Sequence, residues 1–218
     1  EPSYAYPGQR WLVEERDACG VGFVADQQGR SSHALVARSL DALSCMEHRG
    51  GCSADQDSGD GAGLMTAVPV ELLQDWLTTE GIDAAIPFAV GMVFLPKDAA
   101  SAQFARQIIE QTLIDNDLQI LGWRVVPVHP EVLGRQAREN EPRSEQILVR
   151  STLAGDEFER QLYLARKQIA RAISAAAKAT PTLAECYICS LSARTIVYKG
   201  MLMPVQVGQY FPELHDPD

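Results

Sequence analysis

The sequence predicts a protein of the α+β class. Short runs rich in β-branched and aromatic residues alternate with longer stretches in which apolar residues recur every three or four positions, as in strands and amphipathic helices. Between residues 86 and 192 the predicted order is β-α-β-β-α-β, the split β-α-β motif. The 218 residues are 46% hydrophobic and 22% charged, which is ordinary for globular proteins and enough for a sizeable core.

The N-terminal part of the chain alternates irregular and regular segments. Residues 1–18 combine prolines, aromatic residues and a charged run without a helical or strand period, so we expect an irregular leader. Residues 21–25 predict a strand, closed by a turn at 26–29. Residues 33–47 predict an amphipathic helix, because one face of it collects Val36, Leu40, Leu43 and Met46.

The remaining elements follow from the same patterns. We predict strands at 64–68, 88–95, 120–126, 146–153, 187–192 and 195–198, and helices at 70–77, 99–115, 158–178 and 204–210. The longest helix places one apolar stripe over Leu162, Ala165, Ile169, Ala172, Ile173 and Ala176. We expect residues 86–192 to form a lobe inserted into, or leaning against, the part that contains Cys19.

Composition argues against several classes of function. Lys and Arg number 19 and Asp and Glu 29, and this net charge of −10 disfavours nucleic acid or an anionic membrane as the main partner. The chain has no apolar run of the roughly 18 to 20 residues that a membrane span needs, and it does not begin like a signal peptide. Five cysteines, unevenly spaced, suit reduced thiols better than a disulfide framework. We therefore expect a cytoplasmic protein.

Three short motifs are tested before any stronger signal. Asp55-x-Asp57 begins like a calcium loop but lacks the glycine and the glutamate that such a loop needs. The glycine-rich run 59–63 is not followed by Lys-Ser or Lys-Thr, which excludes a P-loop. Cys186 and Cys189 have zinc-ligand spacing, although residues three apart on a strand point to opposite faces. A zinc domain that also uses Cys45, His48 and Cys52 stays open as an alternative.

Cys19 stands directly before a glycine-rich, β-prone run, Gly20-Val21-Gly22-Phe23. Glycines let a substrate approach the backbone closely, so the thiol of Cys19 is a candidate nucleophile at the edge of a strand. Taken alone, the same residues fit the start of an ordinary buried strand better, because free cysteine is among the most buried residue types.

Further residues reverse that preference. Cys19-Gly20-Val21-Gly22-Phe23, Met46-Glu47-His48-Arg49-Gly50-Gly51 and Ser58-Gly59-Asp60-Gly61-Ala62-Gly63 occur in this order. Together they closely resemble the N-terminal glutaminase domain of glutamate synthases, a class II glutamine amidotransferase of the N-terminal-nucleophile hydrolase type. Segments 120–124, 158–163 and 190–201 match the same family, so the resemblance covers nearly the whole chain.

The resemblance implies both a fold and a nucleophile. The fold would be a four-layer αββα sandwich, of which this chain is a part, with Cys19 at the start of a central strand. Residues 19–218 would be the N-terminal half of the glutaminase domain. The thiolate of Cys19 would attack the side-chain amide of glutamine, and the α-amino group of Cys19 would move the proton, which suits its pKa of about 7.7 to 8. Residues 1–18 must then be removed first, because an amide nitrogen cannot act as this base.

The resemblance also assigns substrate-binding residues. Arg49 and Gly50 match the segment that lines the glutamine pocket, and Asp60 lies in a second segment close to it. From the residues alone, Arg49 fits equally well as a cation at a helix C-terminus. For Asp60 the residues alone favour a turn-forming carboxylate, and for His48 a structural role.

The family's oxyanion-hole Asn-Gly pair, and an Arg and an Asp that grip glutamine, are expected after Asp218. We therefore expect little activity from this chain alone, since losing one oxyanion donor typically costs about 2.7 to 4 kcal/mol in the barrier.

The resemblance implies no cofactor within this segment, and FMN and an iron-sulphur cluster further along the chain. The implied partners are L-glutamine, the rest of the synthase chain, and ferredoxin or an NAD(P)H-dependent subunit as electron donor. In a eukaryote it also allows a plastid location. The alternative from another class is an unprocessed, non-catalytic binding or regulatory module with the same fold.

Overall fold

The computed structural model describes residues 20–49, 51, 55, 57–83 and 87–217, and the α+β class is confirmed in it. The helices are α1 (His33–Cys45), α2 (Val70–Thr79), α3 (Ala99–Ile114), α4 (Arg135–Glu139), α5 (Gly155–Ala176) and α6 (Gln206–Tyr210). The strands are β1 (Ala62–Ala67), β2 (Ala89–Leu95), β3 (Gln119–Val125), β4 (Arg143–Arg150), β5 (Tyr187–Ser192) and β6 (Thr195–Gly200). Short 3-10 helices cover Glu47–Arg49, Pro130–Val132, Pro181–Glu185 and Pro212–His215.

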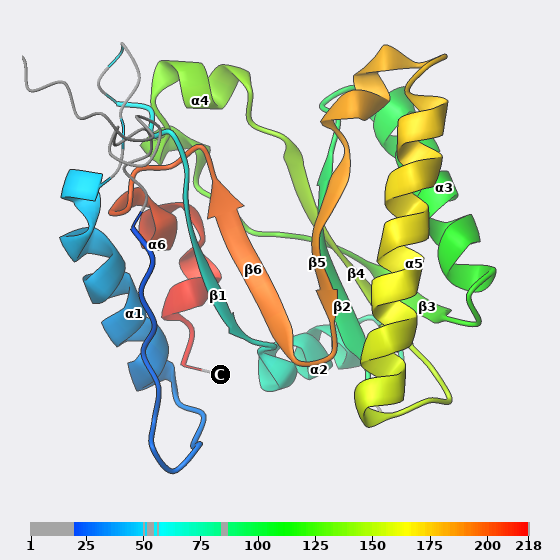
Figure 1. Ribbon diagram of the computed structural model, residues 1–218, viewed down its shortest axis with the longest axis horizontal. Coiled ribbons are helices and arrows are strands. Elements are labelled where there is room, and N and C mark those ends of the chain that lie inside the picture. The colour runs from blue at the N-terminus through cyan, green and yellow to red at the C-terminus, as the bar shows by residue number, and fades with distance from the viewer. Residues whose placement is uncertain (1–19, 50, 52–54, 56, 84–86, 218) are drawn as a thin grey trace, which may run out of the picture.

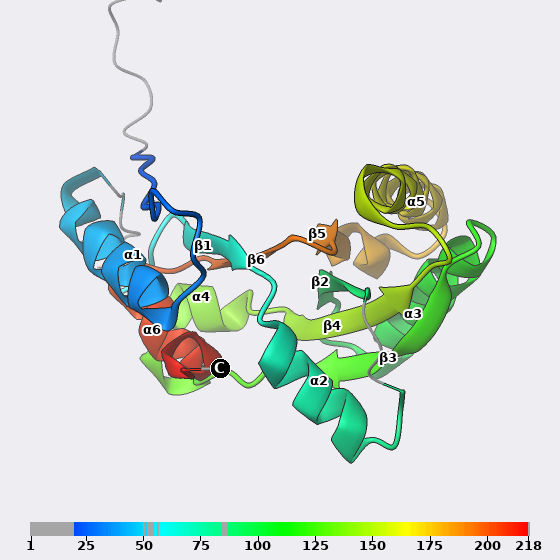
Figure 2. The ribbon, with the colours of Figure 1, turned by 90° about the horizontal axis from the view of Figure 1, so that it is seen from below.

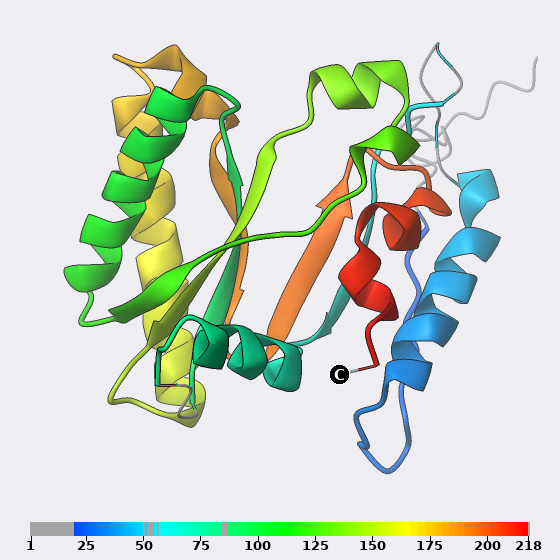
Figure 3. The ribbon, with the colours of Figure 1, turned by 180° about the vertical axis from the view of Figure 1, so that it is seen from behind.

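Four antiparallel strands form the larger sheet, in the order β3-β4-β2-β5. Along the chain their order is β2-α3-β3-β4-α5-β5, with the short helix α4 between β3 and β4, so the β-α-β-β-α-β arrangement is confirmed. Helices α3 and α5 lie side by side against one face of this sheet (Figure 3). The predicted stripe of α5 points into that layer, where Leu162, Ala165, Ile169 and Ile173 are buried.

Strand β2 explains why this sheet has two covered faces. All seven of its residues are buried, and their side chains alternate between two cores. Val93 and Leu95 join the core beneath α3 and α5. Met92 and Phe94 join a second core that also contains residues of α2, β6 and α6.

The second core is completed by a two-stranded antiparallel sheet, β1 with β6, and by helices. Across Figure 1 the order from one side to the other is α3 with α5, the four-stranded sheet, the two-stranded sheet, and α1 with α6. Figure 2 shows the same separation of the two helix pairs from below. It also shows α2 on the face of the four-stranded sheet that is opposite α3 and α5. This succession of helices, sheet, sheet and helices agrees with the αββα prediction.

Two local predictions differ from the structure. The sequence predicts a strand at residues 21–25, but in the structure these residues form no strand and have no strand partner among the described residues. Helix α4 was not predicted, since its five residues are too few to show a helical period. In the described part of the chain no helix is both long enough and apolar enough to cross a membrane.

Candidate functional site

The predicted site residues fall at the edge of the described part of the chain. Cys19 and Gly50 lie outside the described residues. Arg49 is the last residue of the 3-10 helix Glu47–Arg49, which directly follows α1. Gly20, the residue next to Cys19, lines a large open cavity. Gly20 is the first described residue of the chain, so the described part of the chain begins at this cavity.

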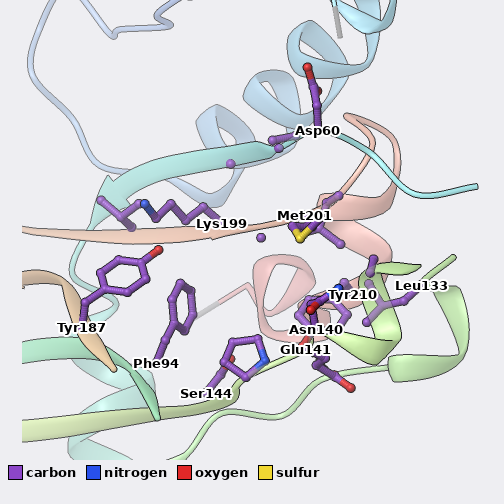
Figure 4. A pocket seen from close by; sticks show the side chains of 18 of the residues that line it. Asp60, Phe94, Leu133, Asn140, Glu141, Ser144, Tyr187, Lys199, Met201 and Tyr210 are labelled. Carbon is purple, nitrogen blue, oxygen red and sulfur yellow. The ribbon is translucent and has the colours of Figure 1, made fainter. Parts of the chain in front are cut away.

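The cavity has a volume of about 1240 Å³ and lies between the two sheets. One wall is formed by residues 60–65 and by the end of β6, and the opposite wall by the ends of β2 and β4 and the segment 139–142. Figure 4 shows Lys199 and Met201 on one side of the space, Phe94 and Tyr187 facing them, and Asp60 at the edge. The structure thus brings together Gly20, Met46 and the 60–63 segment, three of the regions that the sequence motifs singled out.

The loop before β1 is held in place by Asp55 and Ser58. The Ser58 hydroxyl, fully buried, donates to Asp55 Oδ2 at 2.6 Å and accepts from the Ala137 backbone N–H at 3.0 Å. Asp55 also accepts from the backbone N–H groups of Ser58 and Gln136. These hydrogen bonds, that from the Ser58 side chain first, lower the pKa of Asp55 below its ordinary value. Asp55, the first residue of the motif that begins like a calcium loop, therefore ties this loop to α4.

Two glycines let this loop approach other segments closely. A side chain at Gly59 would place its Cβ 2.1 Å from the Leu202 carbonyl oxygen. A Cβ at Gly51 would lie 2.8 Å from Asp60 Oδ2, and the Asp60 backbone N–H donates to the Gly51 carbonyl oxygen at 3.1 Å. Asp60 is thereby held against Gly51, and Gly51 follows Arg49 by two residues. The matched segment that begins at Met46 and the one that begins at Ser58 therefore meet at the edge of the cavity.

The far end of the cavity is shaped by aromatic residues. The Tyr210 hydroxyl donates to Glu141 Oε1 at 2.7 Å, and burial, followed by this carboxylate, raises the pKa of Tyr210. The Phe94 and Tyr187 rings meet edge to face with their centroids 5.2 Å apart, and Lys199 Nζ lies 5.0 Å from the Tyr187 ring centroid. Sequence reasoning missed these residues, because they come from separate elements and share no motif.

The remaining candidate ligands are dispersed. His48 Nδ1 lies 3.0 Å from the Cys45 carbonyl oxygen at the end of α1, which agrees with a structural role. Cys186 is buried, and burial raises its pKa to about 11, while Cys45 is exposed. Within the described ranges, groups of three or more His, Cys, Asp or Glu that would hold a metal ion are absent.

Comparisons with known proteins agree with the motif resemblance. The model of the family described as "Glutamine amidotransferases class-II" matches residues 19–218. The chain belongs to the class II glutamine amidotransferases. The match begins at Cys19, so the candidate nucleophile is the first residue of the family's domain in this chain.

Among the class II amidotransferases, glutamate synthases are similar to this chain. The Synechocystis sp. protein named "Ferredoxin-dependent glutamate synthase 2" is 49% identical over 214 residues, which are 96% of this chain and 13% of that protein. The Oryza sativa protein named "Ferredoxin-dependent glutamate synthase, chloroplastic" is 46% identical over 209 residues, 94% of this chain and 13% of that protein. The Azospirillum brasilense "Glutamate synthase [NADPH] large chain" is 38% identical over 207 residues, 93% of this chain and 13% of that protein. The chain thus spans about an eighth of the length of these relatives.

Proposed function

We propose that this chain is the nucleophile-bearing part of the glutaminase of a glutamate synthase, and that the assembled glutaminase hydrolyses L-glutamine to glutamate and ammonia. The family match begins at Cys19, and Gly20, the next residue in the sequence, lines the cavity between the two sheets. The proposal rests on this observation, that the residue directly after the candidate nucleophile in the sequence lines a large cavity.

In the proposed reaction the Cys19 thiolate attacks the side-chain amide carbon of glutamine. Collapse of the tetrahedral intermediate breaks the carbon–nitrogen bond, forms a thioester and releases ammonia, which takes a proton from the α-amino group of Cys19. Water then hydrolyses the thioester to glutamate and restores the thiol. The free α-amino group exists only once residues 1–18 have been removed, so we propose that this leader is cleaved.

Arg49, Gly50 and Asp60 are proposed to line the glutamine pocket beside Cys19. A guanidinium binds a carboxylate through two parallel hydrogen bonds, which suits Arg49 to the α-carboxylate of glutamine. The contact of Asp60 with Gly51 supports a positioning role for Asp60, because it holds the segment after Arg49 at the cavity edge.

The full-length protein treated with a glutamine analogue that carries an electrophilic carbon tests the nucleophile. We expect one adduct per chain, located on Cys19 by peptide mass spectrometry, and protection by excess glutamine. Cys19→Ser should lose the adduct, whereas Cys45→Ala, which removes an exposed thiol, should keep it. An adduct on another cysteine would contradict the assignment.

The intact mass of the natural protein tests the processing step. An N-terminus at Cys19 supports the enzyme, and an N-terminus at or before Glu1 supports the alternative of an unprocessed binding or regulatory module. The separate proposal that the 218-residue chain alone has little glutaminase activity is checked by measuring the release of ammonia from glutamine by this chain and by the full-length protein.

For the whole protein we propose that the ammonia aminates 2-oxoglutarate at a distant site. Seven of the relatives are named ferredoxin-dependent, which supports ferredoxin as the electron donor. FMN and an iron-sulphur cluster would belong to the rest of the chain, and no step proposed here uses them. The cytoplasm is the proposed compartment, with a plastid in a photosynthetic eukaryote, as the chloroplastic relatives support.

A further inference from the structure

Gln206, the first residue of α6, is buried, and its side-chain amide bonds to the backbone of three segments. Its Oε1 accepts from the Met203 backbone N–H at 2.8 Å. Its Nε2 donates to the Asp57 carbonyl oxygen at 3.2 Å and to the Val132 carbonyl oxygen at 2.8 Å. Because both N–H groups of the amide face carbonyl oxygens and its oxygen faces an N–H, these partners fix the orientation of the amide. One side chain thus joins the loop before β1, the 3-10 helix at 130–132 and the turn before α6.

The contact with Asp57 fixes the beginning of the segment 57–60, which leads into β1. The Asp57 backbone is also packed tightly against α4, since a Cβ at Gly134, the residue before that helix, would lie 2.4 Å from the Asp57 carbonyl carbon. The next residue, Ser58, accepts from the Ala137 backbone N–H at 3.0 Å through its hydroxyl group. Gln206 and the start of α4 therefore hold the first two residues of this segment together.

The other end of the segment 57–60 contacts the residues after Arg49. A Cβ at Gly59 would lie 2.1 Å from the Leu202 carbonyl oxygen, so the backbone has no free space on that side. The Asp60 backbone N–H donates to the Gly51 carbonyl oxygen at 3.1 Å. Closely packed segments transmit strain, so we expect a displacement at the beginning of this segment to reach its end.

Gln206 is separated from the large cavity by the segment that it holds. Asp60 lines the cavity between the two sheets, whereas Gln206 and Asp57 both line a second, smaller cavity. An effect of Gln206 on glutamine would therefore pass through the segment 57–60 and not through contact with the substrate.

We propose that Gln206 is a positioning residue for glutamine binding. Its amide fixes the segment 57–60, and the end of that segment holds the residues after Arg49 at the cavity edge. The inference rests on the proposed function, because it takes these residues to line the glutamine pocket. Loss of the amide should weaken glutamine binding and leave the reactivity of the Cys19 thiol unchanged.

Steady-state kinetics of the full-length protein test this role. Gln206→Glu keeps the size of the side chain but places a carboxylate oxygen against two carbonyl oxygens. We therefore expect the KM for glutamine to rise by about 10-fold or more, with kcat changed by less than about 3-fold. Gln206→Met, which keeps the volume and removes the hydrogen bonds, should also raise the KM.

The control for these variants is Gln209→Glu, at an exposed position of the same helix, which should leave the KM unchanged. The KM does not depend on how much of a preparation is folded, so a loss of folded protein alone does not imitate the expected result. An unchanged KM in either Gln206 variant would overturn the proposal.

Labelling of Cys19 separates glutamine binding from thiol reactivity. In the Gln206→Glu variant, a glutamine analogue with an electrophilic carbon, used below saturation, should label Cys19 about 10-fold more slowly than in the wild type. Iodoacetamide, which lacks the α-amino acid group, should label Cys19 at a rate within about 2-fold of the wild type. Equal slowing with both reagents would overturn the proposal, because Gln206 would then support the nucleophile or the fold as a whole.

Amide hydrogen exchange tests the connection in the absence of glutamine. The Asp60 N–H should exchange about 10-fold faster in Gln206→Glu than in the wild type or in Gln209→Glu, because its hydrogen bond to Gly51 opens more often. Unchanged exchange at Asp60 would overturn the proposal.

The two proposals fail separately. Faster exchange at Asp60 in Gln206→Glu, in a protein whose Cys19 is never labelled by the glutamine analogue, would contradict the glutaminase and support the link from Gln206 to Asp60. Labelling of Cys19 in the wild type, with an unchanged KM in the Gln206 variants, would support the glutaminase and overturn the positioning role.

Discussion

Ser58 joins two segments that are 79 positions apart in the sequence. Its hydroxyl group donates to Asp55 and accepts from the Ala137 backbone N–H, and the side chain is fully buried. A buried hydroxyl with both functions in use is costly to remove, because its partners lose their hydrogen bonds without gaining water. The shape of the cavity wall at residues 60–63 depends on this anchor, since β1 starts within a few residues of it.

Ser58→Ala is expected to destabilise the protein. The Ala137 N–H would be left buried and unpaired, which typically costs about 1 to 3 kcal/mol. Urea denaturation of the chain measures this change in the free energy of unfolding. Ser174→Ala, at an exposed position of α5, is the control and should change stability by less than about 0.5 kcal/mol. Equal stability of the two variants would show that the Ser58 anchor contributes nothing.

Arg49 has two interpretations that kinetics can separate. If its guanidinium binds the glutamine carboxylate, Arg49→Lys loses the bidentate contact, and the KM for glutamine in the full-length protein should rise by roughly 10-fold or more. If Arg49 only complements the dipole of the preceding helix, the lysine variant keeps the charge, and the KM stays unchanged. Arg38→Lys, on the exposed face of α1, is the matched control.

Among the elements, α3 shows how sequence and structure agree. Asp98 precedes the helix, has extended backbone angles, and accepts from the Ser101 backbone N–H at 2.8 Å. This is the arrangement of a helix N-cap, in which a carboxylate takes up one of the free N–H groups of the first turn. The hydrogen bonds from the Ser101 backbone and side chain lower the pKa of Asp98 below its ordinary value.

Substitution at Asp98 is expected to lower the melting temperature in a pH-dependent way. Asp98→Ala removes the cap and should lower the melting temperature at pH 7 by about 2 to 4 °C. Because the folded-state pKa is lower than the unfolded value of about 3.9, the extra stability is present above about pH 4 and is lost as the pH falls through the folded pKa. Asp98→Asn keeps an acceptor at pH 7 and should remove part of the acid sensitivity. A wild-type acid transition that both variants reproduce would contradict the cap.

At the scale of the whole molecule, Glu213 links the two sheets to the C-terminal segment. Glu213 Oε2 accepts from Arg124 of β3 at 2.8 Å, and Oε1 accepts from Tyr198 of β6 at 2.8 Å and from Gln146 of β4 at 3.3 Å. The side chains of Arg124 and Glu213 are only 10% and 4% exposed. Burial, followed by this carboxylate, raises the pKa of Tyr198, which keeps its hydroxyl a donor.

Glu213→Gln is expected to be strongly destabilising. The substitution leaves the Arg124 charge buried without its counter-charge, and breaking a buried ion pair in this way typically costs about 3 to 5 kcal/mol. The free energy of unfolding from urea titration measures the loss. Glu80→Gln, exposed at the end of α2, should change stability by less than about 0.5 kcal/mol. A loss at Glu213 no larger than at Glu80 would contradict a linking role.

The sequence by itself determined most of the local elements and the motif at Cys19. The stripe of α5 and the β-α-β-β-α-β order are visible from periodicity, because burial of one helix face or of alternate strand residues leaves a local repeat. The short run 19–23 likewise marks the point at which the family's domain begins in this chain. The roles of Cys19, Arg49 and Gly50, and the boundaries at 1–18 and 86–192, stay predictions.

Only the tertiary structure decided how these elements pair. The strand order β3-β4-β2-β5, the anchoring of Ser58 on α4, and the cavity between the two sheets depend on contacts between segments far apart in the sequence. Residues 20–25 have the composition of a strand, yet no strand pairs with them among the described residues. A strand exists only beside another strand, so composition alone does not make this segment a strand. Periodicity records which side of an element is buried, and it contains no information about which surface buries it.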